Sequence, residues 1–192
     1  MWDHRKGIEI KLTNFNLNTY HTLILDFDGV FTNNKVYLNE LGQESIMCDK
    51  SDSMGFNLLN AYLKKFNLEM NCFVLSKEKN KVIELRLKKL KIKWLKKIDN
   101  KLEFIKKYLK DNFDKKLSNK GIIYIGNDIN DLESILFSGY SFCPIDSHNL
   151  VKNSVKKIIN KEGGNGFIRE CIEEIINLNK LNIDEIIELI RS

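Results

Sequence analysis

The chain has 192 residues, of which 43% are hydrophobic and 30% are charged, a size and composition typical of one globular domain. It holds no apolar run of about 18 residues, so the sequence predicts no membrane-spanning helix. The first twelve residues are charged and lack an apolar stretch, so we expect no secretory signal. The four cysteines form no CxxC pair, which predicts reduced thiols in a cytoplasmic protein rather than a zinc site or a disulfide framework.

The net charge of +5 conceals a basic block at residues 77–120, where 17 Lys/Arg stand against 6 Asp/Glu. Such a block can attract nucleic acid or anionic substrates. Nucleic-acid-binding proteins typically interleave their basic residues with aromatic ones and carry a recognisable binding motif. This block has neither feature. We therefore interpret the block as a solvated helical face and expect no nucleic-acid partner, with nucleic-acid binding as a distant alternative.

Apolar runs and helical patterns alternate along the chain, which indicates an α/β fold. In chain order, the patterns predict a buried strand at 22–27, a hairpin within 36–47, a helix from a Ser53 cap to Phe66, a strand at 72–75, a Lys-rich helix around 82–90, a weaker strand at 92–95, a helix around 102–109, a strand at 122–125, a short helix at 131–137, strands at 140–143 and 155–159, and helix from Phe167 to the end. We expect a Rossmann-like, doubly wound, mainly parallel sheet.

Ligands of such sheets bind beyond the carboxyl ends of the strands, so polar residues that directly follow strands are the functional candidates. Two carboxylates held close together favour a hard cation such as Mg²⁺, which prefers oxygen ligands. A metal, a lysine, a hydroxyl and a carboxylate nucleophile together make a site for phosphoryl transfer. The candidates are Asp26, Asp28, Ser76, Asn127, Asp128 and Asp131, and Lys101, at the start of a predicted helix, could join them.

Four of these segments resemble the motifs of haloacid dehalogenase-type phosphatases. Residues 23–32 (LILDFDGVFT) resemble the first motif, 74–76 the second, Lys101 the third and 126–131 the fourth. The resemblance implies that Asp26 attacks phosphorus and forms an aspartyl-phosphate. It also implies that Asp28 protonates the leaving oxygen and then activates water, and that Ser76 and Lys101 bind the phosphoryl oxygens.

The cofactor implied by the resemblance is Mg²⁺. It would lie between the Asp26 carboxylate, the Asp28 backbone carbonyl and the fourth motif. That motif departs from the family pattern, because Asn127 stands where relatives carry an aspartate ligand. Asp128 or Asp131 could supply the missing charge.

Further segments resemble one branch of that family, which holds the 3-deoxy-octulosonate (KDO) 8-phosphate phosphatases and the phosphatase-like C-terminal domain of acylneuraminate cytidylyltransferases. The stretch Ser76–Asn80 (SKEKN) looks more like the acylneuraminate side, and Glu78 stands where the octulosonate enzymes place an arginine. The segments that carry the resemblance are 52–55, 76–80, 99–101 and 163–170.

The branch implies a small-molecule substrate, the phosphate ester of an acidic sugar. We expect an acylneuraminate 9-phosphate or a related 2-keto-3-deoxy sugar acid phosphate, with Lys77 and Arg169 in substrate binding. The arginine guanidinium can bind a carboxylate through two hydrogen bonds. The alternative for Arg169 is a structural ion pair with a nearby acid.

The expected organisation is an N-terminal extension at 1–20, a phosphatase-like domain at 21–172 and a C-terminal helical tail at 173–192. A hairpin insert at about 30–48 would replace a cap domain, and by resemblance the protein would form a homotetramer. Two alternatives to a sugar acid phosphatase stay open: a catalytically weak oligomerisation module related to acylneuraminate cytidylyltransferases, and a KDO 8-phosphate phosphatase.

Overall fold

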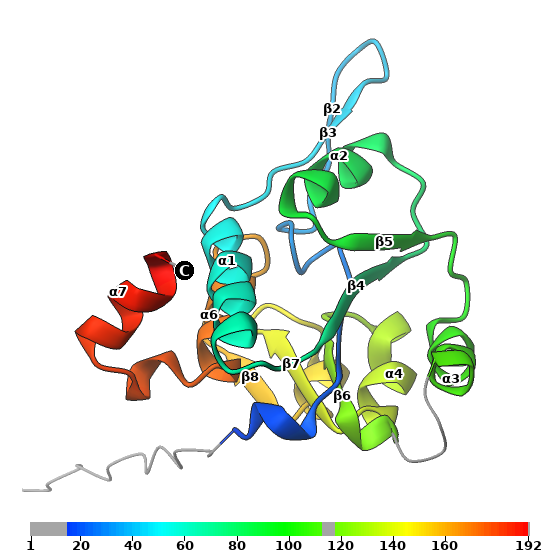
Figure 1. Cartoon of the computed structure of the whole chain (residues 1–192). Coiled ribbons are helices and arrows are strands. Elements are labelled where there is room, and N and C mark those ends of the chain that lie inside the picture. The colour runs from blue at the N-terminus through cyan, green and yellow to red at the C-terminus, as the bar shows by residue number, and fades with distance from the viewer. Residues whose placement is uncertain (1–14, 113–117, 192) are drawn as a thin grey trace, which may run out of the picture.

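The computed structural model describes residues 15–112 and 118–191, and its centre is a six-stranded sheet in the order β5-β4-β1-β6-β7-β8 (Figure 1). Every pair of neighbours is parallel, which confirms the doubly wound α/β fold. The central strands are apolar runs buried on both faces, as is typical of parallel sheets covered by helices. The strands are β1 (Thr22–Leu25), β4 (Asn71–Ser76), β5 (Lys93–Lys96), β6 (Ile122–Ile125), β7 (Tyr140–Pro144) and β8 (Lys157–Ile159).

Helices cover both faces of the sheet and divide the core in two (Figure 1). Three helices pack on one face, α1 (Ser51–Lys65), α2 (Lys81–Leu90) and α6 (Phe167–Ile175). The other face is covered by α3 (Lys101–Asn112), α4 (Leu132–Phe137) and α5 (Asn149–Lys152). Among the described residues, no helix combines the length and the apolar character that a membrane span requires.

Alternate residues of each strand supply the two halves of the core. In β1, Leu23 and Leu25 face one layer of helices and Ile24 faces the other, and all three are fully buried. The period-two direction of side chains in a strand produces this alternation. Because β1 lies between β4 and β6, this tightly packed strand fixes the residues that follow its carboxyl end.

The predicted hairpin is present as an antiparallel pair, β2 (Tyr37–Leu38) and β3 (Glu44–Ser45). It projects beyond the carboxyl end of the sheet (Figure 1), and both of its strands are exposed. An isolated two-stranded ribbon is only marginally stable in water. A hydrogen bond of 2.7 Å from Asn80 Nδ2 to Glu44 Oε1 ties it to the loop before α2.

Two local predictions are wrong. Ser53 does not cap α1, because the helix already begins at Ser51, whose N–H donates to Asp49 Oδ1 at 2.7 Å. The chain is also not continuous helix after Phe167, since α6 ends and Asn177 adopts a left-handed conformation with a φ of 51°.

Short 3₁₀ turns and one further helix complete the described chain. After η4 (Leu178–Lys180), the amphipathic α7 (Ile183–Arg191) packs on α1. The remaining 3₁₀ turns are η1 (Leu17–Thr19), η2 (Asn119–Gly121) and η3 (Ile129–Asp131). Most of the N-terminal extension predicted at 1–20 lies outside the described residues, which begin at Phe15.

Candidate active site

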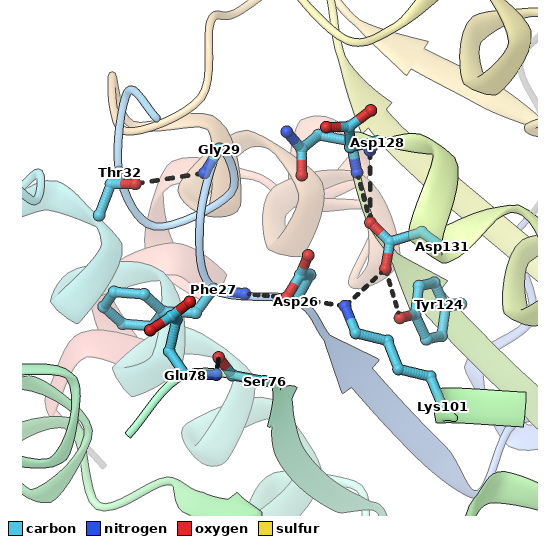
Figure 2. Close-up of polar contacts among 11 residues, drawn as sticks. Asp26, Phe27, Gly29, Thr32, Ser76, Glu78, Lys101, Tyr124, Asp128 and Asp131 are labelled. Carbon is cyan, nitrogen blue, oxygen red and sulfur yellow. Dashed lines mark hydrogen bonds and ion pairs between the residues drawn. The ribbon is translucent and has the colours of Figure 1, made fainter. Parts of the chain in front are cut away.

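The candidate residues meet at the carboxyl end of the sheet (Figure 2). Asp26 directly follows β1, Ser76 ends β4, and Asn127 follows β6 after one glycine. The N–H of Asp26 donates to the Ile125 carbonyl at 2.9 Å, so it continues the pairing of β1 with β6. Since β1 pairs with both β4 and β6, the three strand ends lie side by side.

Three buried charged side chains are in contact at the base of the site. Lys101 Nζ lies 2.9 Å from Asp26 Oδ1 and 2.8 Å from Asp131 Oδ1. The three side chains are only 2%, 9% and 0% exposed, in the order Lys101, Asp26, Asp131. Two carboxylates thus share one ammonium group, so the ionised set carries a net negative charge in a poorly solvated place. Such an excess favours a further cation.

These buried charges shift the pKa values of both Asp26 and Lys101. Burial raises the pKa of Asp26 above its ordinary value, and the neighbouring Asp131 raises it further, while Lys101 opposes both. Burial alone would lower the pKa of Lys101, but Asp26 and Asp131 raise it above its ordinary value. Lys101 therefore stays a cation, as a residue that neutralises phosphoryl oxygens must.

Asp131 is held by four hydrogen bonds. Its Oδ1 accepts from Lys101 Nζ and, at 2.7 Å, from the hydroxyl of Tyr124. Its Oδ2 accepts from the backbone N–H groups of Asn127 at 3.0 Å and Asp128 at 3.4 Å. Both oxygens are therefore engaged within the protein, and Asp131 positions Lys101 and the loop after β6.

Tyr124 is a site residue that the sequence reasoning missed. It lies inside β6, is fully buried and faces the layer of α3 and α4. A buried phenol needs a hydrogen-bond partner, and here that partner is Asp131. The only available signal was a tyrosine inside an otherwise aliphatic strand.

Asp128 and Asn127 play different roles in the loop after β6. Asp128 is exposed and its Oδ1 accepts from the N–H of Ile129 at 2.7 Å, so it caps η3. Asn127 is only 8% exposed, and its Oδ1 is buried with no hydrogen-bond partner. A buried amide oxygen without a partner costs free energy, which makes Asn127 Oδ1 a candidate ligand atom.

Gly29 leaves space for that amide. A Cβ at this position would lie 1.9 Å from Asn127 Nδ2, and the residue has a φ of +73°. Both the close approach and the left-handed backbone require glycine. The loop is also held by the Gly29 N–H, which donates to Thr32 Oγ1 at 3.2 Å.

An inner pocket of about 220 Å³ lies over these groups. Ser76 ends β4 as a buried residue, and its Oγ accepts from the Glu78 N–H at 3.0 Å. Asp28 is half-buried; burial raises its pKa, and Glu78 raises it further while Lys101 opposes the shift. A raised pKa suits a proton donor near neutral pH. The inner pocket is lined by Asp26, Asp28, Asn34, Ser76, Lys77, Glu78, Asn127, Asp128 and Asn130.

The two residues predicted to bind substrate are placed differently. Lys77 is exposed and lines the inner pocket. Arg169 lies on α6, where its Nε pairs with Glu173 one turn along the same helix. That contact is the structural ion pair that the sequence left open, and substrate binding by Arg169 stays a prediction.

The oxygen atoms at this site fit a hard divalent cation that keeps most of its water ligands. Within residues 15–112 and 118–191, no three His, Cys, Asp or Glu side chains cluster as a closed metal cage. Mg²⁺ does not require one, since it keeps several waters and often takes one or two carboxylates. The Asp26 carboxylate, the Asp28 carbonyl and the orphaned Asn127 Oδ1 are the oxygens that would hold it.

Comparisons with known proteins show what the whole chain is similar to. No family model matches the chain. It is 25% identical over 159 residues to N-acylneuraminate cytidylyltransferase A of Danio rerio, which covers 82% of this chain but 35% of that protein, so the chain spans about a third of its length. It is 27% identical over 161 residues to 3-deoxy-D-manno-octulosonate 8-phosphate phosphatase KdsC of Haemophilus influenzae, with 80% of this chain and 81% of that protein covered.

Solved structures share the fold. A chain from Streptomyces avermitilis described as a HAD family hydrolase superposes with a TM-score of 0.75 at 29% identity, covering 88% of this chain and 93% of the other. The 3-deoxy-D-manno-octulosonate 8-phosphate phosphatase of Moraxella catarrhalis, in complex with magnesium, phosphate and KDO, has a TM-score of 0.74 at 22% identity, covering 89% and 93%. Fold and relatives confirm the predicted resemblance: the chain is similar to haloacid dehalogenase-type phosphatases, which are phosphoric monoester hydrolases.

Proposed function

We propose that the chain is a Mg²⁺-dependent phosphatase that hydrolyses the phosphate monoester of an acidic sugar through an aspartyl-phosphate. The substrate class is an acylneuraminate 9-phosphate or a related 2-keto-3-deoxy sugar acid phosphate. The observation that carries the proposal is the buried contact of Lys101 with Asp26 at the base of the inner pocket. It pairs a carboxylate nucleophile with a fixed cation where a phosphoryl group would bind.

The first step is attack by Asp26 on phosphorus. Its Oδ1 accepts from the Phe27 N–H at 2.8 Å and from Lys101, which leaves Oδ2 as the attacking oxygen. As the new bond from Oδ2 to phosphorus forms, the bond from phosphorus to the sugar oxygen breaks. Asp28 gives its proton to that oxygen, so the sugar leaves as a neutral alcohol.

The second step releases phosphate. Asp28, now ionised, takes a proton from a water that attacks phosphorus, and the bond to Asp26 Oδ2 breaks. The Ser76 hydroxyl and the Lys101 ammonium bind the phosphoryl oxygens as charge develops on them. Mg²⁺, when bound at Asp26, the Asp28 carbonyl and Asn127, would neutralise and orient the phosphoryl group.

The test is phosphate release with Mg²⁺ from a panel of sugar acid phosphates that includes the 8- and 9-phosphates. We expect the 9-phosphate of an acylneuraminate or a close relative to be turned over fastest. Asp26→Asn should release no phosphate from any of them, because an amide is not a nucleophile, while its circular dichroism stays that of the wild type. Phosphate release by this variant at more than a few per cent of the wild-type rate would refute the aspartyl-phosphate.

The second candidate is a catalytically weak oligomerisation module. It is favoured by the neutral Asn127 at a predicted ligand position and by the match to part of a longer cytidylyltransferase. The retention of Asp26, Asp28 and Ser76 in one pocket, with Lys101 in contact with Asp26, favours catalysis. Absence of phosphate release from the whole panel, in a protein that still assembles into an oligomer, would support the module instead.

A further inference from the structure

A second, outer pocket of about 350 Å³ adjoins the inner one. The two share Asp28, Asn34 and Glu78 in their linings. Asp28 is the proposed donor to the leaving oxygen, so the group attached to that oxygen extends past Asp28. The outer pocket therefore begins where the phosphoryl site ends.

The lining of the outer pocket is acidic, although the proposed substrate is itself an anion. It holds three carboxylates, Asp28, Glu44 and Glu78, against one lysine, Lys35. Within the described residues, neither Glu44 nor Glu78 forms an ion pair. Both line the same pocket as Asp28, and Glu78 also lines the inner pocket, so their negative charges lie near the point where the leaving group starts.

The local fold holds the backbone of Glu78 and the side chain of Glu44. Glu78 follows Ser76 in a tight turn in which its N–H donates to Ser76 Oγ. Glu44 comes from the hairpin and accepts from Asn80 Nδ2 at 2.7 Å, while Asn80 Oδ1 caps α2 by accepting from the Val82 N–H at 2.9 Å. Asn80 therefore fixes Glu44 against the loop that carries Glu78, without neutralising its charge.

We propose that the outer pocket holds the leaving group, and that Glu44 and Glu78 select a leaving group that presents hydroxyl or amide N–H donors there and disfavour one that presents a carboxylate. The proposal rests on the proposed function and narrows its substrate class. Ionised carboxylates only accept hydrogen bonds, so they bind donors and repel like charge. The carboxylate of a sugar acid would then point away from the glutamates, towards Lys35 or solvent.

The test compares two esters that differ by one carboxylate, phenyl phosphate and 4-carboxyphenyl phosphate. For each protein the measured quantity is the ratio of kcat/KM for the carboxylated ester to that for the plain ester, at low salt with Mg²⁺. Comparing this ratio between variants cancels the different chemical reactivities of the two leaving groups. The proteins are wild type, the double variant Glu44→Gln with Glu78→Gln, and the control Glu40→Gln, an exposed glutamate on the same hairpin that lines neither pocket.

Each like charge a few ångströms away in water weakens binding about three- to sixfold. Removing both glutamates should therefore raise the ratio about ten- to thirtyfold, and added salt should reduce the difference. Glu40→Gln should leave the ratio within about twofold of wild type. An unchanged ratio in the double variant, with both esters hydrolysed, would overturn this inference alone. A lower ratio in the double variant than in wild type would overturn the inference as well. Absence of phosphate release by wild type from the whole panel of sugar acid phosphates would overturn the proposed function and the inference with it.

Discussion

Replacing Asp131 with asparagine tests whether this residue positions the site or binds the metal. The fully buried carboxylate accepts from Lys101, Tyr124 and the N–H groups of Asn127 and Asp128. In Asp131→Asn one of the two oxygens becomes an NH₂ group, which faces two of these donors instead of accepting from them. Lys101 also loses one of its two counter-charges.

The expected cost follows from those contacts. A hydrogen bond to a charged group contributes about 1.5–3 kcal/mol, and removing one partner of a buried ion pair costs about 3–5 kcal/mol. Because Lys101 keeps Asp26, we take the lower part of that range and expect the free energy of unfolding to fall by about 3 kcal/mol. For a chain of this length, that corresponds to a fall in Tm of about 6–12 °C.

The assay is urea unfolding followed by circular dichroism, with EDTA and again with Mg²⁺. Asp128→Asn is the matched control, because Asp128 is exposed and asparagine caps a helix as well as aspartate does. The free energy of unfolding of this control should lie within about 0.5 kcal/mol of the wild-type value. If Asp131→Asn lowers the free energy of unfolding only when Mg²⁺ is present, or by less than about 1 kcal/mol in EDTA, the positioning role is wrong.

Three further predictions concern the metal, pH and assembly. Asn127→Asp should raise Mg²⁺ affinity, because Mg²⁺ prefers anionic oxygens; Mg²⁺ titrations of activity and Tm check this, and identical curves for both proteins would mean that Asn127 does not face the metal. Burial raises the pKa of Asp52 to about 7, so between about pH 4 and 7 the folded protein holds a proton that the unfolded chain has released, and stability falls as pH rises. Asp52→Asn cannot ionise, so its free energy of unfolding relative to wild type should rise across that window; urea titrations at both ends measure it, and a constant difference would contradict it. Five apolar side chains of hairpin residues 36–47 are more than half exposed, which supports the predicted homotetramer; light scattering should give about four times the chain mass, and a monomer at micromolar concentration would contradict it.

The sequence predicted the parts of the site that depend on local pattern and on topology. Apolar runs marked β1, β4 and β6, and parallel strands bring their carboxyl ends to one edge. Asp26, Ser76 and Asn127 could therefore be placed together before the structure was known. Lys101 was identified by resemblance and by its place at the start of a predicted helix.

What the sequence did not predict depends on contacts between distant segments. Asp131 accepts a hydrogen bond from Lys101, which lies thirty positions away in the chain. It accepts another from Tyr124, whose hydroxyl direction is set by packing against α3 and α4. Arg169 is a different case. Its partner Glu173 lies four residues along the same helix, and that spacing brings side chains together, so the ion pair was available in the sequence.

The aspartyl-phosphate on Asp26 is the central claim, and acid-quench peptide mass spectrometry tests it most directly. The wild-type protein is mixed with Mg²⁺ and its best sugar acid phosphate, quenched in acid within milliseconds, and digested at low pH. The account predicts one added phosphoryl group on the peptide that contains Asp26, at a level that rises and then decays as the substrate is consumed. Phosphate release without any phosphorylated form of that peptide, or a phosphoryl group found on another residue, would contradict the account.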